Sequence, residues 1–148
     1  MYTIDASVWV NGFDRREPEH TITRQVLSIL SVRAISIIVP TLVLPEVAGA
    51  ISRTRAATVE AQAFAIALSN LPNVTFASLD AALAQQALRL AAKHRLRGAD
   101  AVYAAVAEQA GTTLITLDNE QISRLAGVVP TQTPAALLPV LSPRRSSS

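Results

Sequence analysis

Four carboxylate residues share a setting that is unusual for acidic side chains. Each of them follows a predicted strand or begins a predicted helix among apolar neighbours: Asp5, Glu46, Asp100 and Asp118. Two carboxylates about 5 Å apart repel by roughly 3 kcal/mol at an effective dielectric of about 20. A pocket that holds all four therefore requires protons or a cation. An all-oxygen cluster favours Mg²⁺ or Mn²⁺ over zinc, because the chain has no cysteine and its two histidines are far apart in sequence.

The clearest signal is the stretch GADAVYAAVAEQAGTTLITLDNE, residues 98–120. It predicts a helix of small residues, a turn at Gly111 and a buried strand over Thr112–Leu117. Asp100 lies in the first turn of that helix, and Asp118 follows the strand. In a parallel α/β unit, helix starts and strand ends lie at the same edge of the sheet, where such folds bind their ligands. We therefore expect these two carboxylates to be close in space.

The other two acids have local structural explanations as well as a functional one. Asp5 follows a predicted strand at Tyr2–Ile4 and is suited to cap the next helix. Glu46 begins a helix, where the dipole favours an acid. Four acids at one sheet edge are harder to explain structurally than any one alone. Ser7 and Thr116 place hydroxyl groups beside this cluster, where they can orient a carboxylate or a metal-bound water.

The hydrophobic pattern predicts an α/β fold, with a central parallel sheet of four or five strands flanked by helices. We expect one domain over residues 1–141 and a disordered tail over 142–148. A polar loop is expected over 11–19, with Pro18 in the first turn of the next helix. The helix over 56–70 is expected to turn Val59, Ala63, Ile66 and Ala67 to one face. The remaining strands are expected at Ile35–Val39, Val74–Ala77 and, at one edge, Val128–Pro130.

Composition narrows the functional classes. Of the 148 residues, 50% are hydrophobic and 16% are charged, which excludes a disordered chain. No apolar run approaches the ~20 residues of a membrane span, and no leader peptide is evident. The absence of cysteine fits a reducing cytoplasm. The net charge of +2 is weakly basic, but Arg95 and Arg97 lie just before Asp100 and are candidates for contact with a polyanion.

Other carboxylate chemistries fit less well. A haloacid-dehalogenase-like phosphatase requires a second Asp two residues after the first, where this chain has Ser7. A response-regulator receiver requires a lysine near the end of the sheet, and the only lysine is Lys93. Neither a GxxxxGK phosphate loop nor a GxGxxG turn is present.

Four segments together resemble the PIN-domain nucleases, and most closely their small VapC-type toxins: DASVWV, LPEVAGAI, RGADAVYAAVAEQAG and LITLD. The similarity extends from Asp5 to about Val129. It implies a PIN-like three-layer domain in which the four acids form the catalytic site. By the same resemblance, metal is held chiefly by Asp5, Asp100 and Asp118, while Glu46 completes the coordination or takes a proton from water. Ser7 and Thr116 match supporting hydroxyl positions.

The resemblance also implies a function and its partners. We expect a Mg²⁺- or Mn²⁺-dependent endoribonuclease that leaves a 5′-phosphate and a 3′-hydroxyl, with RNA contacts at Arg95 and Arg97. A cognate antitoxin, a homodimer and a cytoplasmic location are expected, and no membrane contact. The chain departs from many relatives after the last Asp, where it has Asn119 to Ile122 in place of a stretch that reaches an aromatic residue. Alternatives are a catalytically silent module that binds RNA or protein, and an RNA-processing or DNA-directed nuclease with the same site.

Overall fold

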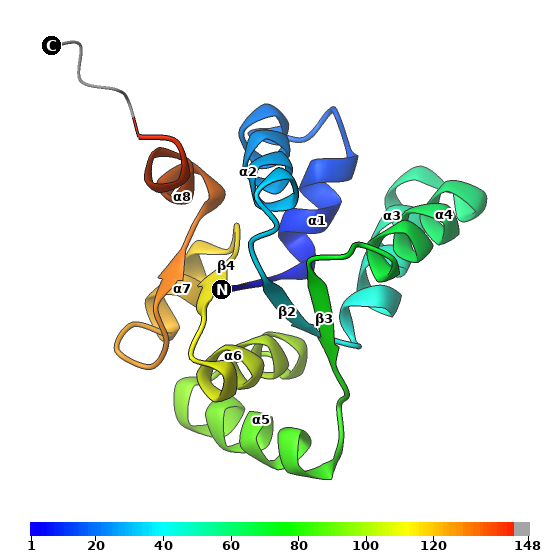
Figure 1. Cartoon of the computed structure of the whole chain (residues 1–148). Helices are drawn as coiled ribbons and strands as arrows, with labels where there is room; N and C mark the ends of the chain where they lie inside the picture. The colour runs from blue at the N-terminus through cyan, green and yellow to red at the C-terminus, as the bar shows by residue number, and fades with distance from the viewer. Residues whose placement is uncertain (144–148) are drawn as a thin grey trace, which may run out of the picture.

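A five-stranded parallel sheet forms the centre of the protein, with the strand order β3-β2-β1-β4-β5 (Figure 1). The computed structural model describes residues 1–143 apart from the side chain of Arg55, so residues 144–148 of the expected tail lie outside the described residues. The sheet confirms the predicted α/β class and its parallel strands. The strands are β1 (Tyr2–Ile4), β2 (Ile37–Pro40), β3 (Val74–Ala77), β4 (Thr113–Ile115) and β5 (Thr131–Gln132).

Helices cover the sheet on both sides and make a three-layer arrangement (Figure 1). On one side α6 packs against β1, β2 and β4, with α5 outside it. On the other side α1 packs against α2 and α3, α3 pairs with α4, and α2 contacts α8. The helices are α1 (Ala6–Phe13), α2 (His20–Val32), α3 (Val43–Arg55), α4 (Thr58–Ser69), α5 (Ala81–His94), α6 (Gly98–Ala110), α7 (Asn119–Arg124) and α8 (Pro134–Leu141). No helix among the described residues is long and apolar enough to cross a membrane.

The sequence of α6 explains its central place. Its small residues from Ala101 to Ala107 are buried, and small side chains allow the helix to approach the sheet closely. Tyr103 is the large exception and is fully buried. Gly111 then ends the helix with φ 66°, a left-handed conformation that glycine adopts without strain. The chain enters β4 directly afterwards, so α6 and β4 run antiparallel and Asp100 lies at the carboxyl edge of the sheet.

Several predicted boundaries were wrong by a few residues. The loop predicted over 11–19 is shorter, because α1 continues to Phe13. Pro18 is outside α2, since Glu19 adopts a left-handed conformation with φ 65° and the helix begins at His20. The edge strand is at Thr131–Gln132 rather than Val128–Pro130. Backbone hydrogen bonds decide where each helix and strand begins and ends, and the hydrophobic pattern of the sequence indicates those boundaries only approximately.

The predicted orientation of α4 was also wrong. Val59 and Ile66 are 75% and 60% exposed, whereas Ala61 and Leu68 on the opposite face are buried. The helix carries apolar residues on both faces, so periodicity alone did not decide which face packs. The structure leaves the face that contains Val59 and Ile66 uncovered.

Candidate active site

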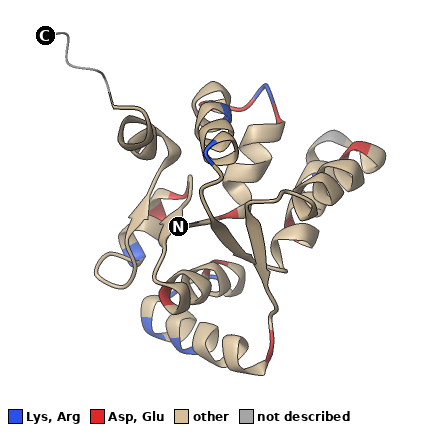
Figure 2. Cartoon of the chain, in the orientation of Figure 1, with Lys and Arg blue, Asp and Glu red and all other residues tan. Residues whose placement is uncertain are grey.

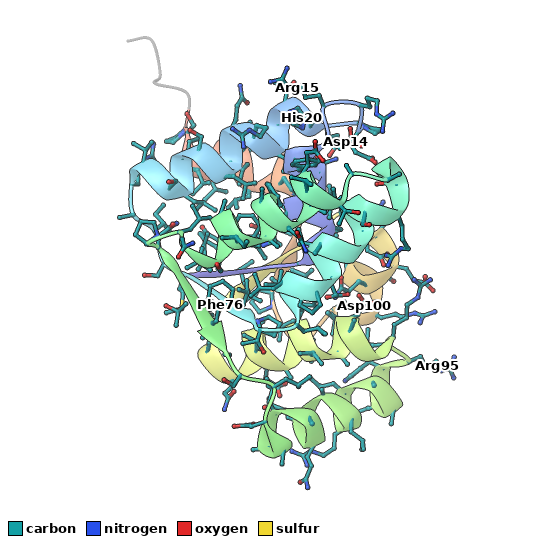
Figure 3. All side chains as sticks on the ribbon, turned by 90° about the vertical axis from the view of Figure 1, so that its right-hand side faces the viewer. Asp14, Arg15, His20, Phe76, Arg95 and Asp100 are labelled. Atoms are coloured by element: carbon teal, nitrogen blue, oxygen red, sulfur yellow. The ribbon has the colours of Figure 1, made fainter. Side chains whose placement is uncertain are left out.

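Asp100 is the electrostatic centre of the predicted acidic cluster. Burial, and then the charges of Asp5, Asp118 and Glu46, raise its pKa to about 6, while Arg97 acts in the opposite direction. Such effects require short distances, so the structure brings the four predicted acids near one another at the carboxyl edge of the sheet. Figure 3 shows Asp100 at the end of α6 that lies next to the start of α3.

Asp5 follows β1 and is only 7% exposed. It occupies the N-cap position of α1, yet its side chain makes no capping hydrogen bond. Instead its Oδ2 is 2.8 Å from the hydroxyl of Ser7 and 2.8 Å from the hydroxyl of Thr116. Burial raises the pKa of Asp5, and these two hydrogen bonds partly offset that effect. The side chain is therefore oriented into the cluster rather than along the helix.

Glu46 lies in the first turn of α3 and is held by a residue of α6. The Tyr103 hydroxyl donates a hydrogen bond to Oε1 of Glu46 at 2.6 Å. Burial and the negative charge of Asp5 raise the pKa of Glu46, whereas the bond from Tyr103 lowers it. The pKa of the phenol itself is raised far above its usual value by burial and by Glu46, so Tyr103 stays a neutral donor.

Asp118 has a structural role in addition to its place in the cluster. Its Oδ1 caps α7 by accepting hydrogen bonds from the backbone amides of Glu120 at 2.9 Å and Gln121 at 3.3 Å. The backbone amide of Asp118 donates to the Thr116 hydroxyl at 3.1 Å. Because that hydroxyl also contacts Asp5, Thr116 links the two acids.

Two residues of this network were not identified from the sequence, Tyr103 and Gln121. Gln121 is 2% exposed, and its Oε1 lies 2.9 Å from the Thr116 hydroxyl. Its side-chain amide is directed at the backbone carbonyl of Asp100 at 3.5 Å. Tyr103 had a local signal, since it lies three residues after Asp100 on the same side of the helix. Gln121 had none, because a polar residue after a helix cap is usually solvated.

The two predicted RNA-binding arginines differ in position. Arg97 directly precedes α6, lines a small hollow with Asp100 and Asp118, and lowers the pKa of Asp100. Arg95 is exposed and extends outward beyond the end of α5 (Figure 3). Its backbone carbonyl accepts a hydrogen bond from the guanidinium of Arg124. Basic residues gather along α5 and on α2 with the loop before it, as Figure 2 shows.

The carboxylate oxygens of the acidic cluster are suitable ligands for a hard divalent cation, but they do not surround an ion on all sides. Within residues 1–143, no group of three or more His, Cys, Asp or Glu side chains is compact enough to hold a metal ion. Mg²⁺ usually keeps several waters and binds proteins through one or two carboxylates. Asp5 and Asp100 fit that arrangement, because Asp5 exerts the largest charge effect on Asp100.

The fold and these residues can be compared with known proteins. The PIN domain family model matches residues 2–128. The chain belongs to the PIN-domain family. This confirms the resemblance drawn from the sequence segments. A comparison with curated protein sequences found no match for this PIN domain.

Solved structures share the fold of this PIN domain. VapC20 from Mycobacterium tuberculosis, described as a Sarcin-Ricin loop cleaving toxin, is 18% identical with a TM-score of 0.72 over 83% of this chain and 94% of that chain. PAE2754 from Pyrobaculum aerophilum is 21% identical with a TM-score of 0.68 over 95% and 94%. A toxin–antitoxin complex from Klebsiella pneumoniae contains a chain that is 17% identical with a TM-score of 0.65 over 90% and 98%.

Proposed function

We propose that this PIN domain is a Mg²⁺- or Mn²⁺-dependent endoribonuclease and the toxin of a toxin–antitoxin pair. One observation carries the proposal: Asp5, Glu46 and Asp118 lie close enough to the half-buried Asp100, at the carboxyl edge of the sheet, for their charges to act on it. Perturbed acids that gather at the ligand-binding edge of an α/β sheet are typical of active sites. The candidate metal ligands are Asp5 and Asp100, with Asp118, the third ligand expected from the sequence, completing the site through a water.

Each side chain has a distinct part in the proposed hydrolysis. A bound divalent ion would lower the pKa of a water and polarise the scissile phosphate. Glu46, with its raised pKa and fixed by Tyr103, takes a proton from the attacking water. The water oxygen bonds to phosphorus as the bond to the 3′ oxygen breaks, and that oxygen takes a proton from solvent. The products are a 5′-phosphate and a 3′-hydroxyl.

Ser7 and Thr116 act on the acids and not on the substrate. Their hydroxyls hold Asp5 in one orientation, which preorganises the candidate ligand before an ion binds. Thr116 also connects Asp5 to the backbone of Asp118. Arg97, beside Asp100, is the better placed of the two arginines proposed to contact RNA phosphates.

The proposed RNA substrate and the proposed partners are inferred from similar proteins. VapC20 is described as a toxin that cleaves the Sarcin-Ricin loop, and another similar chain was solved in a toxin–antitoxin complex. We propose by analogy a cognate antitoxin partner, a homodimer and a cytoplasmic location, with residues 1–141 as the nuclease domain. The uncovered apolar face of α4, with Val59 and Ile66, favours some protein contact.

An RNA cleavage assay tests the proposed chemistry. The purified chain is incubated with a structured RNA in Mg²⁺, Mn²⁺ or EDTA, alongside Asp100→Asn and the control Asp80→Asn. Asp80 only caps α5 by accepting a hydrogen bond from the Leu83 amide, a role that Asn fills about as well. We expect metal-dependent cleavage by wild type and Asp80→Asn, and a loss of about 100-fold or more for Asp100→Asn. Cleavage in EDTA, or full activity of Asp100→Asn, contradicts the proposed site.

A further inference from the structure

A cleft of about 650 Å³ lies between α1 and α3, directly beside the candidate active site. Ser7 and Glu46 line it at the acidic cluster, and Arg53 lines it on α3. We propose that this cleft binds the RNA nucleotide adjacent to the scissile phosphate and that Arg53 holds the phosphate of that nucleotide. The proposal rests on the proposed nuclease function and adds a substrate subsite to it.

Arg53 is an exposed cation with no competing partner. Within the described part of the chain its guanidinium makes no hydrogen bond or ion pair. Arg53 follows Glu46 by seven residues, which places the two on the same side of α3 and about 10 Å apart along the helix axis. The Arg53 side chain bends back to the level of Gly49, so its guanidinium is only about 4.5 Å from Glu46 along the helix axis, within the reach of one nucleotide. A phosphate at Arg53 therefore leaves the next phosphate of the strand near the acidic cluster.

Gly49 makes room for this guanidinium. A Cβ atom built on Gly49 would lie 3.1 Å from Nη1 of Arg53, with no other described residue outside the adjoining part of α3 within 4 Å. The guanidinium thus extends along the bare surface of α3 towards Glu46. Glycine weakens a helix interior, so helix stability does not explain this residue. The space beside Gly49 is instead occupied by the end of the Arg53 side chain.

The other lining residues of the cleft suit a nucleotide chemically. Leu42, Pro45 and Ala50 provide an apolar wall against which a base can pack. A guanidinium forms two parallel hydrogen bonds with a phosphate, which gives orientation as well as charge. Glu17 and Glu46 are the acidic residues of the lining and disfavour a phosphate at their positions. The phosphate is therefore directed to Arg53.

Salt-dependent RNA binding tests the subsite. Affinity is measured in EDTA, which stops metal-dependent cleavage, with an RNA that the wild type cuts in Mg²⁺. We expect Arg53→Ala to bind about tenfold more weakly and the slope of log K against log salt to fall by about 0.7, the value for one lost contact with a single strand. Arg89→Ala is the control, because Arg89 is also exposed but lies on α5 away from the cleft. Equal losses for both variants would mean that only net charge matters, and they overturn the proposal.

Gly49→Leu tests the same contact without removing the charge. Leucine at this position occupies the space of the guanidinium and favours the helix, so the melting temperature should be unchanged or higher. RNA binding should nevertheless fall as far as in Arg53→Ala, and the double variant should be no weaker than either single one. Normal binding by a folded Gly49→Leu protein contradicts the subsite, and so does an additive double variant.

Whether the wild type cleaves RNA distinguishes a failure of the Arg53 subsite from a failure of the proposed nuclease function. If the wild type cleaves RNA and the Arg53 and Gly49 variants bind normally, the subsite is wrong while the nuclease function stands. If the wild type neither binds nor cleaves RNA in Mg²⁺, both are wrong. Cleavage by the wild type with weaker binding by both variants supports the subsite.

Discussion

The Tyr103 hydroxyl of α6 lies 2.6 Å from Oε1 of Glu46 on α3 and is fully buried. This contact joins helices on opposite sides of the sheet edge, fifty-seven positions apart in the chain. It gives Glu46 a fixed neutral donor on one oxygen. The second oxygen is left for water or substrate.

Removing that donor should affect cleavage more than stability. Tyr103→Phe keeps the buried ring, and we expect about 1 kcal/mol of lost stability by urea unfolding, because half-buried Glu46 regains water. Cleavage should fall about tenfold, mainly in kcat, since Glu46 is no longer oriented. Tyr2→Phe is the control, as the Tyr2 hydroxyl makes no hydrogen bond within residues 1–143. Equal activity for the two variants would mean that Tyr103 only fills space.

Stability and cleavage should depend on the hydroxyl of Thr116 and not on the shape of its side chain. Thr116→Val removes one of the two hydroxyls that donate to Oδ2 of Asp5 and the hydroxyl that accepts from the Asp118 amide, and we expect about 1 to 3 kcal/mol of lost stability. Thr116→Ser restores the hydroxyl and should recover most of the stability and the cleavage rate. A matched change at Thr112, whose buried hydroxyl hydrogen-bonds to the Thr3 hydroxyl at 2.7 Å, should cost about 1 kcal/mol and spare cleavage. Similar activity of the two Val variants contradicts the positioning role.

The metal-free protein should lose stability as pH rises from about 4 to 7. The pKa of Asp100 in the folded protein is about 6, above its ordinary value of 3.8. Between these values the folded state binds more protons than the unfolded state, so the free energy of unfolding falls with rising pH. Asp100→Asn should flatten this decrease and be more stable than wild type at neutral pH. Chemical denaturation in EDTA across this range measures it, and an unchanged profile for Asp100→Asn counts against the electrostatic cluster.

Asp5 should determine the response to Mg²⁺. An ion that binds only the folded state stabilises it by about 2.7 kcal/mol at a concentration of 100 Kd. We expect Mg²⁺ to raise the melting temperature of wild type at neutral pH, and Asp5→Asn to raise it without metal but to lose this response. If Asp5 were only a helix cap, Asn would change neither quantity. A full Mg²⁺ shift in Asp5→Asn would remove Asp5 from the proposed ligands.

The two arginines before α6 should behave differently. Arg97→Ala removes the cation beside Asp100, so the pKa of Asp100 should rise further and the cleavage profile should move to higher pH. RNA binding should also weaken, with a smaller salt slope. Arg95→Ala should change the pH profile little, because its side chain extends into solvent. Identical pH profiles for the two variants would assign both arginines to the solvated surface.

A large part of the fold followed from local patterns. The strands Tyr2–Ile4 and Val74–Ala77 were predicted with the observed bounds, because short β-branched and aromatic runs between polar residues have few alternatives. The buried face of α4 was not predicted correctly, because the exposed Val59 and Ile66 and the buried Ala61 and Leu68 are all apolar. Only packing against α3 decides between two faces of equal hydrophobicity.

The sequence by itself determined that Asp5, Glu46, Asp100 and Asp118 stand at strand ends and helix starts. Parallel topology then brings such positions to one edge, whatever the details of packing. Their roles as metal ligands and catalytic groups stay predictions.

Only the tertiary structure decided which neutral side chains control those acids. Tyr103 reaches Glu46, and Thr116 reaches Asp5, across more than fifty positions of sequence. Gln121 is buried between Thr116 and the backbone of Asp100 because of how α7 packs beside α6. A hydrogen bond depends on distances of tenths of an ångström, and residue type and periodicity carry no such information.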